Sequence, residues 1–184
     1  SPLSTSGDGY VFEHSVQAFF IVQMITGGLV PRMGNCEVTR VVLQADRYRR
    51  NTDDCEVTLR DKTTEAEKTL LVQIKQSFKL SRSNDDFTKT IQDAWKDFNS
   101  QNFNKRYDRI MLVSGSLDRY GVGLKNILTH IQSSYRSADK FWSDYDRDLL
   151  GRSKQELEGL NRLHEKLQLA NDNTPLTRDK EFNF

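Results

Sequence analysis

Residues 69–75, with the sequence TLLVQIK, read as a buried β-strand that carries two polar side chains. A short run of apolar and β-branched residues is typical of a strand. Side chains two residues apart share a face of a strand, so Gln73 and Lys75 point the same way. Such an amide or ammonium needs a polar partner, because burying either group alone is costly. The preceding apolar stretch, DDCEVTL at residues 53–59, offers Asp54 as that partner.

The surrounding sequence alternates strand-like and helix-like segments in an irregular order. The expected elements are, in chain order, a helix over residues 12–24, strands over 36–45, 54–59 and 69–75, a helix over 85–98, a strand over 110–113 and a helix over 124–131. The first three strands form a hairpin-linked meander. Ser114-Gly115-Ser116 ends the fourth strand. This order predicts an α/β fold with a mixed central sheet flanked by helices, followed by a helical C-terminal part.

The composition fits a domain of ordinary size and gives no functional signal by itself. The chain has 184 residues. Its 27 Lys and Arg nearly balance its 26 Asp and Glu, so the net charge gives no indication of nucleic-acid binding. It holds no apolar run of transmembrane length and no signal-peptide pattern near its start, which predicts a cytoplasmic protein without a membrane partner. Cys36 and Cys55 lack the spacing of a metal site or a disulfide framework, and we expect buried free thiols.

We expect three parts along the chain. Residues 1–132 form the α/β core, residues 133–170 form a helical extension packed on it, and residues 171–184 form a linker. The last residues mix Asn, Asp, Pro and Thr with Phe182 and Phe184, which is an unusual end for a complete domain. The chain is therefore expected to continue into a further C-terminal region.

The spacing of Asp54 and Gln73-x-Lys75 on successive strands resembles the signature of the PD-(D/E)xK nuclease superfamily, with Gln in the usual acidic position. The flanking segments that strengthen the resemblance are Gly9-Tyr10-x-Phe12-Glu13, Val42-Leu43-Gln44, Asp53-Asp54 and Ala94-Trp95-x-Asp97-Phe98. Together they are similar to the N-terminal nuclease modules of bacterial anti-phage effectors. These include CD-NTase-associated DNA endonucleases and nuclease-bearing antiviral STAND NTPases. The resemblance covers residues 9–115 and implies a restriction-endonuclease-like sheet.

The resemblance implies a metal-dependent endonuclease for double-stranded DNA. Its catalytic residues would be Asp54, Gln73, Lys75 and Glu13, the last from the first helix. Asp54, Glu13, Gln73 and the Ile74 carbonyl would hold Mg²⁺, for which Mn²⁺ can substitute. Lys75 would orient the attacking water and offset developing negative charge. Gln73 is a neutral ligand, so the site is less negative than one with three carboxylates.

Basic residues near these segments are the expected DNA contacts. They are Arg47, Arg49, Arg50, Lys79 and Arg82. The effector resemblance further implies activation by homo-oligomerisation, a fused C-terminal sensor or NTPase region, and a bacterial cytoplasmic location.

Three alternatives stay open from the sequence. Asp53 competes with Asp54 for the metal role, because a one-residue slip reverses the face of a strand. Gln73 and Lys75 can instead be the polar face of an edge strand, with Lys guarding against edge-to-edge pairing. The neutral Gln73 also keeps alive a catalytically degenerate nuclease-fold module that only binds DNA or mediates assembly.

Overall fold

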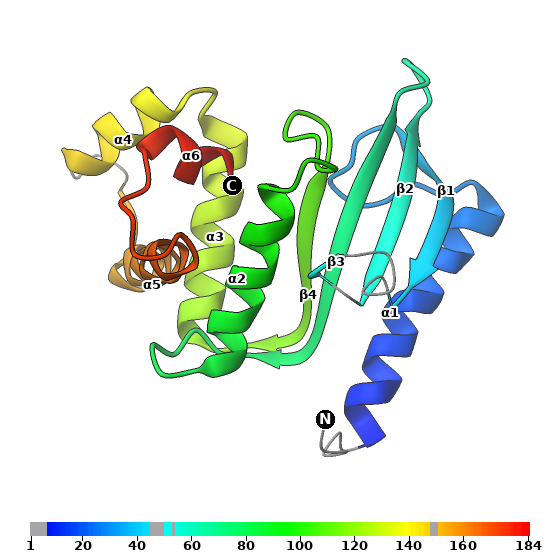
Figure 1. Cartoon of the computed structure of the whole chain (residues 1–184), viewed down its shortest axis with the longest axis horizontal. Coiled ribbons are helices and arrows are strands. Elements are labelled where there is room, and N and C mark those ends of the chain that lie inside the picture. The colour runs from blue at the N-terminus through cyan, green and yellow to red at the C-terminus, as the bar shows by residue number, and fades with distance from the viewer. Residues whose placement is uncertain (1–6, 45–49, 53, 148–150) are drawn as a thin grey trace. The chain divides into compact units, whose positions relative to one another are not determined.

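The computed structural model describes residues 7–44, 50–52, 54–147 and 151–184, and pairs four strands in the order β1-β2-β3-β4 (Figure 1). The elements are α1 (Gly7–Thr26), β1 (Cys36–Leu43), β2 (Cys55–Asp61), β3 (Glu67–Phe78), α2 (Asp85–Phe98), β4 (Arg109–Leu117), α3 (Arg119–Ser134), α4 (Ala138–Asp146), α5 (Lys154–Ala170) and α6 (Arg178–Asn183). The expected element order over the first 134 residues is confirmed, with strand and helix ends that differ by a few residues.

The first three strands form an antiparallel meander, as predicted. Cys36 pairs with Asp61 across β1 and β2, and Cys55 pairs with Val72 across β2 and β3. The register of β1 shifts between Val38 and Arg40, where an extra residue bulges from the strand. The register of β2 on β3 places Asp54 opposite Gln73, because each is one position beyond the Cys55–Val72 pair.

The fourth strand lies beside β3 and runs parallel to it. Near the start of both strands, the Thr69 N–H donates to the Asp108 carboxylate at 2.7 Å. At their ends, the Asp118 N–H donates to the Phe78 carbonyl at 3.3 Å. The sheet is therefore mixed, and α2 is the crossover between its parallel strands. The predicted α/β class with a mixed sheet is confirmed.

The predicted end of the fourth strand at Ser114-Gly115-Ser116 is wrong, because β4 continues to Leu117. A side chain at Gly115 would place its Cβ 2.7 Å from the Gln76 carbonyl oxygen of β3. The glycine thus permits close approach of two paired strands. Its sequence signal was indistinguishable from that of a turn.

The core of the sheet lies under α1. Phe20 of α1 and Val30 after it pack with buried residues of β1, β2 and β3. Cys36 and Cys55 belong to this core, are 0% exposed and form no disulfide, as predicted. Although α1 is long and rich in apolar residues, no helix in the described ranges meets the length and hydrophobicity needed to cross a membrane.

Contacts divide the described part of the chain into two compact units. One unit is Ser1–Ser77 with Lys96–Gly115, and the other is Phe78–Trp95 with Ser116–Phe184. The second unit includes α3 because that helix packs against α5. Their backbones meet closely: a Cβ on Gly159 would lie 2.7 Å from the Tyr120 carbonyl oxygen.

The segment expected to be a linker contains a helix, α6. In the second unit, Phe182 packs on Phe141 of α4, with ring centroids 5.8 Å apart. Phe184 lies against Trp95, with centroids 5.4 Å apart. Both terminal phenylalanines are thus half-buried by aromatic partners.

Candidate functional site

The Asp54 carboxylate is held at the start of β2 by two donors from the centre of β3. The Ile74 N–H donates to Oδ2 of Asp54 at 2.5 Å, and the Gln73 side-chain amide donates to the same oxygen. Gln73 is 6% exposed, so its amide needs this partner. Lys75 follows on the same face of β3 and is half-buried. The structure therefore brings together Asp54 and Gln73, two members of the predicted triplet, and places Lys75 next along that face.

A second set of contacts reaches Asp54 from α1. The side-chain amide of Gln17 donates to the Asp54 backbone carbonyl at 3.3 Å and to the Glu13 carboxylate at 3.0 Å. Glu13 is therefore linked to the backbone of Asp54 through a buried glutamine. Gln17 is a residue whose role the sequence alone did not identify. The available sequence signal for Gln17 was its position one turn after Glu13, on the same face of the helix. We call Glu13, Gln17, Asp54, Gln73, Ile74 and Lys75 the Asp54 cluster.

The segment that precedes Asp54 is anchored by Asp97 of α2. The Asp97 carboxylate accepts hydrogen bonds from the N–H groups of Asn51 and Thr52 and from the Asn51 side-chain amide, at 2.6–3.0 Å. Asp97 is 1% exposed, and these hydrogen bonds offset the free-energy cost of burying its carboxylate. It is a positioning residue whose role the sequence did not indicate. The available sequence signal for Asp97 was an acidic residue next to the apolar residues of α2.

The donor chemistry of the Asp54 cluster fits a hard divalent cation. Asp54 and Glu13 provide carboxylates, and Gln73 provides an amide oxygen if its terminal amide turns over, since the oxygen and nitrogen occupy equivalent positions. The N–H and carbonyl of one strand residue face the same neighbour, so the Ile74 carbonyl also faces the side of Asp54. Oxygen donors of these types suit Mg²⁺. Within the described ranges no three His, Cys, Asp or Glu side chains gather as a metal site, so amide and carbonyl oxygens would be required here.

Cys55, the residue after Asp54, does not share that chemistry. Burial raises the pKa of its thiol to about 12, and the adjacent carboxylates of Asp54 and Glu56 act in the same direction. A protonated thiol is neither a nucleophile nor a good metal ligand.

We expect neither cysteine thiol to react with a disulfide reagent such as DTNB in the native protein at about pH 8, because both are fully buried. After denaturation, both of the chain's cysteines should react. Absorbance after addition of the reagent measures the number of accessible thiols. A native thiol that reacts as fast as the denatured protein would contradict the burial of this core.

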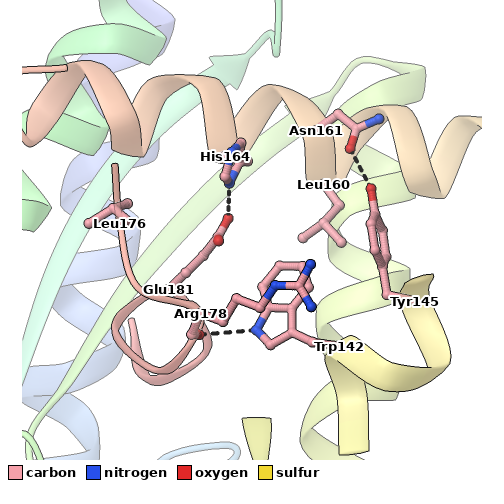
Figure 2. Close-up of a pocket in the computed structure, with 8 residues that line it drawn as sticks. All are labelled: Trp142, Tyr145, Leu160, Asn161, His164, Leu176, Arg178 and Glu181. Atoms are coloured by element: carbon pink, nitrogen blue, oxygen red, sulfur yellow. Dashed lines mark hydrogen bonds and ion pairs between the residues drawn. The ribbon is translucent and has the colours of Figure 1, made fainter. Parts of the chain in front are cut away.

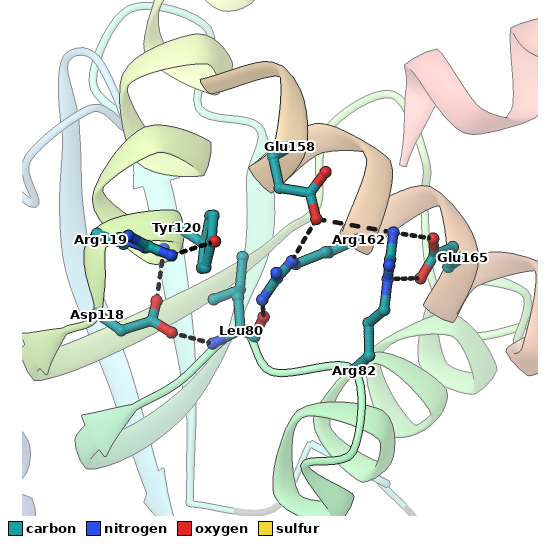
Figure 3. Close-up of polar contacts among 9 residues, drawn as sticks. Leu80, Arg82, Asp118, Arg119, Tyr120, Glu158, Arg162 and Glu165 are labelled. Atoms are coloured by element: carbon teal, nitrogen blue, oxygen red, sulfur yellow. Dashed lines mark hydrogen bonds and ion pairs between the residues drawn. The ribbon is translucent and has the colours of Figure 1, made fainter. Parts of the chain in front are cut away.

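Two of the basic residues expected to contact DNA are engaged by acids. Arg50 pairs with Glu56 at 2.7 Å and its side chain is 13% exposed, so it braces the start of β2. Arg82 forms two hydrogen bonds with Glu165 of α5, at 2.9 and 3.0 Å, and lies 3.7 Å from Glu158 (Figure 3).

The remaining positions of that prediction are one lysine and two arginines. Lys79 is exposed at the start of the loop that carries Arg82. Arg47, Arg49 and the alternative metal ligand Asp53 lie outside the described residues. The DNA contacts therefore stay predictions, and the ion pairs of Arg50 and Arg82 give those two residues structural roles.

The loop after β3 is fixed by α5 as well. Arg162 donates to the Leu80 carbonyl at 2.5 Å, and its guanidinium lies 3.6 Å from the centre of the Tyr120 ring (Figure 3). Buried Lys166 donates to the Arg82 carbonyl at 2.7 Å. Packing between this loop and α5 therefore explains both the burial of Lys166 and the position of Arg82, and no ligand is required.

A hollow of about 370 Å³ in the second unit is a rival site (Figure 2). His164 bonds to Glu181, and Tyr145 donates to Asn161 at 2.8 Å. The Trp142 ring N–H donates to the Arg178 carbonyl at 3.0 Å. The His164 and Trp142 contacts hold α6, and the Tyr145–Asn161 bond joins α4 to α5, so the packing of helices explains this arrangement. The Asp54 cluster is the better functional candidate.

No protein-family model, curated protein or solved structure matches this chain. The residues of the Asp54 cluster are therefore the basis for a functional proposal.

Proposed function

We propose that this chain is a metal-dependent endonuclease domain that hydrolyses phosphodiester bonds of double-stranded DNA. The observation that carries the proposal is the convergence of Gln73 and the Ile74 N–H on the Asp54 carboxylate, with Lys75 next on the same strand face. An acid, an amide and a lysine at the meeting point of two strands match the residue types that metal-assisted hydrolysis requires. The link from Glu13 through Gln17 supports a contribution from α1.

The residues of the cluster have distinct tasks in this proposal. Asp54, Glu13, Gln73 and the Ile74 carbonyl would hold Mg²⁺, with Mn²⁺ as a substitute, and the cation would supply charge neutralisation and an acidic water. The Lys75 ammonium offsets negative charge that develops on the phosphate and orients the attacking water. Gln17 keeps Glu13 and the Asp54 backbone in register, and Asp97 fixes the segment that leads into Asp54.

The sequence resemblance extends the proposal to a cellular role. We propose a DNA-degrading effector of bacterial anti-phage defence, acting in the cytoplasm and activated when copies of the protein assemble. Activation by assembly has a physical reason, since an unrestrained nuclease would cut the host genome. A fused C-terminal sensor or NTPase region would provide the activating signal.

A second candidate is a catalytically degenerate module that binds DNA or mediates assembly without cleavage. The neutral Gln73 favours it, because loss of a carboxylate weakens affinity for a divalent cation. In its hydrogen bond with Asp54, the Gln73 side chain presents its nitrogen, which is the orientation of a structural amide.

Plasmid cleavage with and without Mg²⁺ separates these candidates. We expect conversion of supercoiled DNA to nicked and linear forms in Mg²⁺ and none in EDTA, because the phosphodiester needs the cation. Lys75→Ala should abolish this conversion, because Lys75 would orient the water and offset negative charge. Lys125→Ala, which removes one positive charge at an exposed position of α3, is the control and should cleave as wild type. DNA binding by wild-type protein with no cleavage across a series of Mg²⁺ and Mn²⁺ concentrations would establish the degenerate module instead.

A further inference from the structure

Helix α1 keeps a large apolar surface on the side that faces away from the sheet. Val11, Val22 and Ile25 are 63%, 52% and 75% exposed. Between Gly9 and Thr26, the one side chain that is charged at neutral pH is Glu13, which belongs to the Asp54 cluster. A helix that is apolar on all sides is normally covered on all sides. This outer surface therefore needs a partner.

The exposed residues are spaced as an interhelical seam. Val11, Ser15, Ala18, Val22 and Ile25 follow one another at intervals of four, three, four and three residues, and all five are exposed. At about 100° per residue, they fall within about 40° of one direction on the helix, opposite buried Phe20. This is the heptad spacing by which two helices pack along their length. We call these five residues the outer seam of α1.

We propose that the outer seam of α1 binds the same seam of a second copy of this chain, with the two helices antiparallel. With Ala18 on the two-fold axis, Val11 of one copy lies opposite Ile25 of the other, and Val22 lies one position from Ser15. Small Ala18 and Ser15 side chains lie near the centre of the contact and allow the backbones to come close, while the large Val11 and Ile25 side chains meet at its two ends. The seam is thus complementary to itself.

The polar member of the seam can be buried in such a contact. The Ser15 hydroxyl already donates to the Val11 carbonyl at 2.7 Å, so covering it leaves no unpaired donor. Beside the seam, Ser15 and Phe19 border an apolar hollow of about 310 Å³ that Pro31 and Met111 also line. The hollow can accept an apolar side chain from the second copy. With no like charges in the seam, the two copies meet without repulsion.

The size of the seam predicts a weak dimer. A helix of 20 residues is about 30 Å long and about 10 Å across, so its outer face presents on the order of 300 Å². A standard interface buries about 800 Å² on each partner. Isolated copies should therefore exchange between monomer and dimer, and copies held in one assembly should pair fully because their effective concentration is higher. Coupling of this pairing to cleavage rests on the proposed nuclease function, whereas the pairing itself does not.

Cysteine cross-linking of the full 184-residue chain tests the seam directly. In Ala18→Cys, two thiols meet at the symmetry axis, and we expect a disulfide-linked dimer on mild oxidation. Asn126→Cys, at an exposed position of α3, is the matched control, and Cys36 and Cys55 do not interfere because they are fully buried. The dimer fraction on a non-reducing gel should be about tenfold higher for Ala18→Cys than for the control. Equal cross-linking of the two variants would overturn the proposal.

Mixing variants tests the direction of the helices. Val11→Cys and Ile25→Cys should cross-link with each other when mixed, whereas Val11→Cys alone should remain monomeric. Dimers of Val11→Cys alone, without cross-links in the mixture, would overturn the antiparallel arrangement.

A charge at the axis tests the association without cross-linking. Ala18→Glu should shift a concentrated sample to monomer in sedimentation velocity, since two like charges meet in the seam, whereas Asn126→Glu should behave as wild type. Wild-type protein that stays monomeric at about 1 mM would overturn the proposal, because a weak specific dimer is populated there. These measurements report association alone, so an inactive but dimeric protein would refute the nuclease function and leave the seam intact.

Discussion

Replacing Asp54 with asparagine is expected to lower Mg²⁺-dependent DNA cleavage by roughly a hundredfold or more, because it removes the central negative charge of the Asp54 cluster. Asparagine keeps a side-chain carbonyl oxygen that can accept the hydrogen bond from the Ile74 N–H. Alanine would leave that N–H and the buried Gln73 amide without an acceptor, so it would mix a loss of stability with a loss of activity. The initial rate of plasmid nicking at several Mg²⁺ concentrations measures the effect.

A change in metal dependence distinguishes a ligand from a residue that only supports the fold. The Mg²⁺ concentration for half-maximal cleavage should rise by about tenfold in Asp54→Asn if residual activity can be measured, because one anionic oxygen donor is lost. Asp139→Asn, at an exposed position in the first turn of α4, removes the same charge and should leave the rate unchanged. Wild-type cleavage by folded Asp54→Asn would show that the reaction does not depend on this cluster.

Replacing Asp97 with alanine is expected to lower the free energy of unfolding by about 3 kcal/mol, because hydrogen bonds to a buried carboxylate are each worth about 1.5–3 kcal/mol and their effects partly overlap. The change leaves the N–H groups of Asn51 and Thr52 without their acceptor. These residues lead into Asp54, so cleavage should fall as well. Urea denaturation followed by circular dichroism gives the free energy of unfolding.

A carboxylate at the exposed start of the same helix is the control for Asp97. Asp85 lies in the first turn of α2, where an acid stabilises a helix by about 0.3–1 kcal/mol, so Asp85→Ala should cost far less than Asp97→Ala. Asp97→Asn should fall between them, since it retains an acceptor but loses the charge. A similar cost for Asp97→Ala and Asp85→Ala would contradict the anchoring role of Asp97.

Local sequence was sufficient for the strands that carry the candidate site. The pattern of β2 and β3 placed Asp54 and Gln73 on neighbouring strands, and their register then brought the two side chains together. Ser114-Gly115-Ser116 misled the prediction for β4, because glycine serves equally in a turn and where two backbones lie close. The helix in residues 178–183 was also missed, since its packing on aromatic residues of α4 decides its structure more than its short sequence does.

The partners of several charged residues could not be predicted from local sequence. Arg50 and Arg82 read as free cations in the sequence, but each has an acidic partner that folding brings to it. Asp97 likewise accepts hydrogen bonds from the N–H groups of a segment more than 40 residues earlier, and these bonds define its role. The spacing of residues within one segment gives no information about such pairs, because the two partners lie in different segments.

The sequence by itself determined the order of strands and helices, the burial of both cysteines and the opposition of Asp54 to Gln73. These follow from apolar periodicity and from the alternation of side chains along paired strands, which are properties of short segments. Only the tertiary structure decided that Gln17 joins Glu13 to Asp54, that Asp97 anchors the approach to it, and that one side of α1 stays exposed. The physical reason is that hydrogen-bond partners and burial are set by packing between segments far apart in the chain, where a residue's own neighbours carry little information.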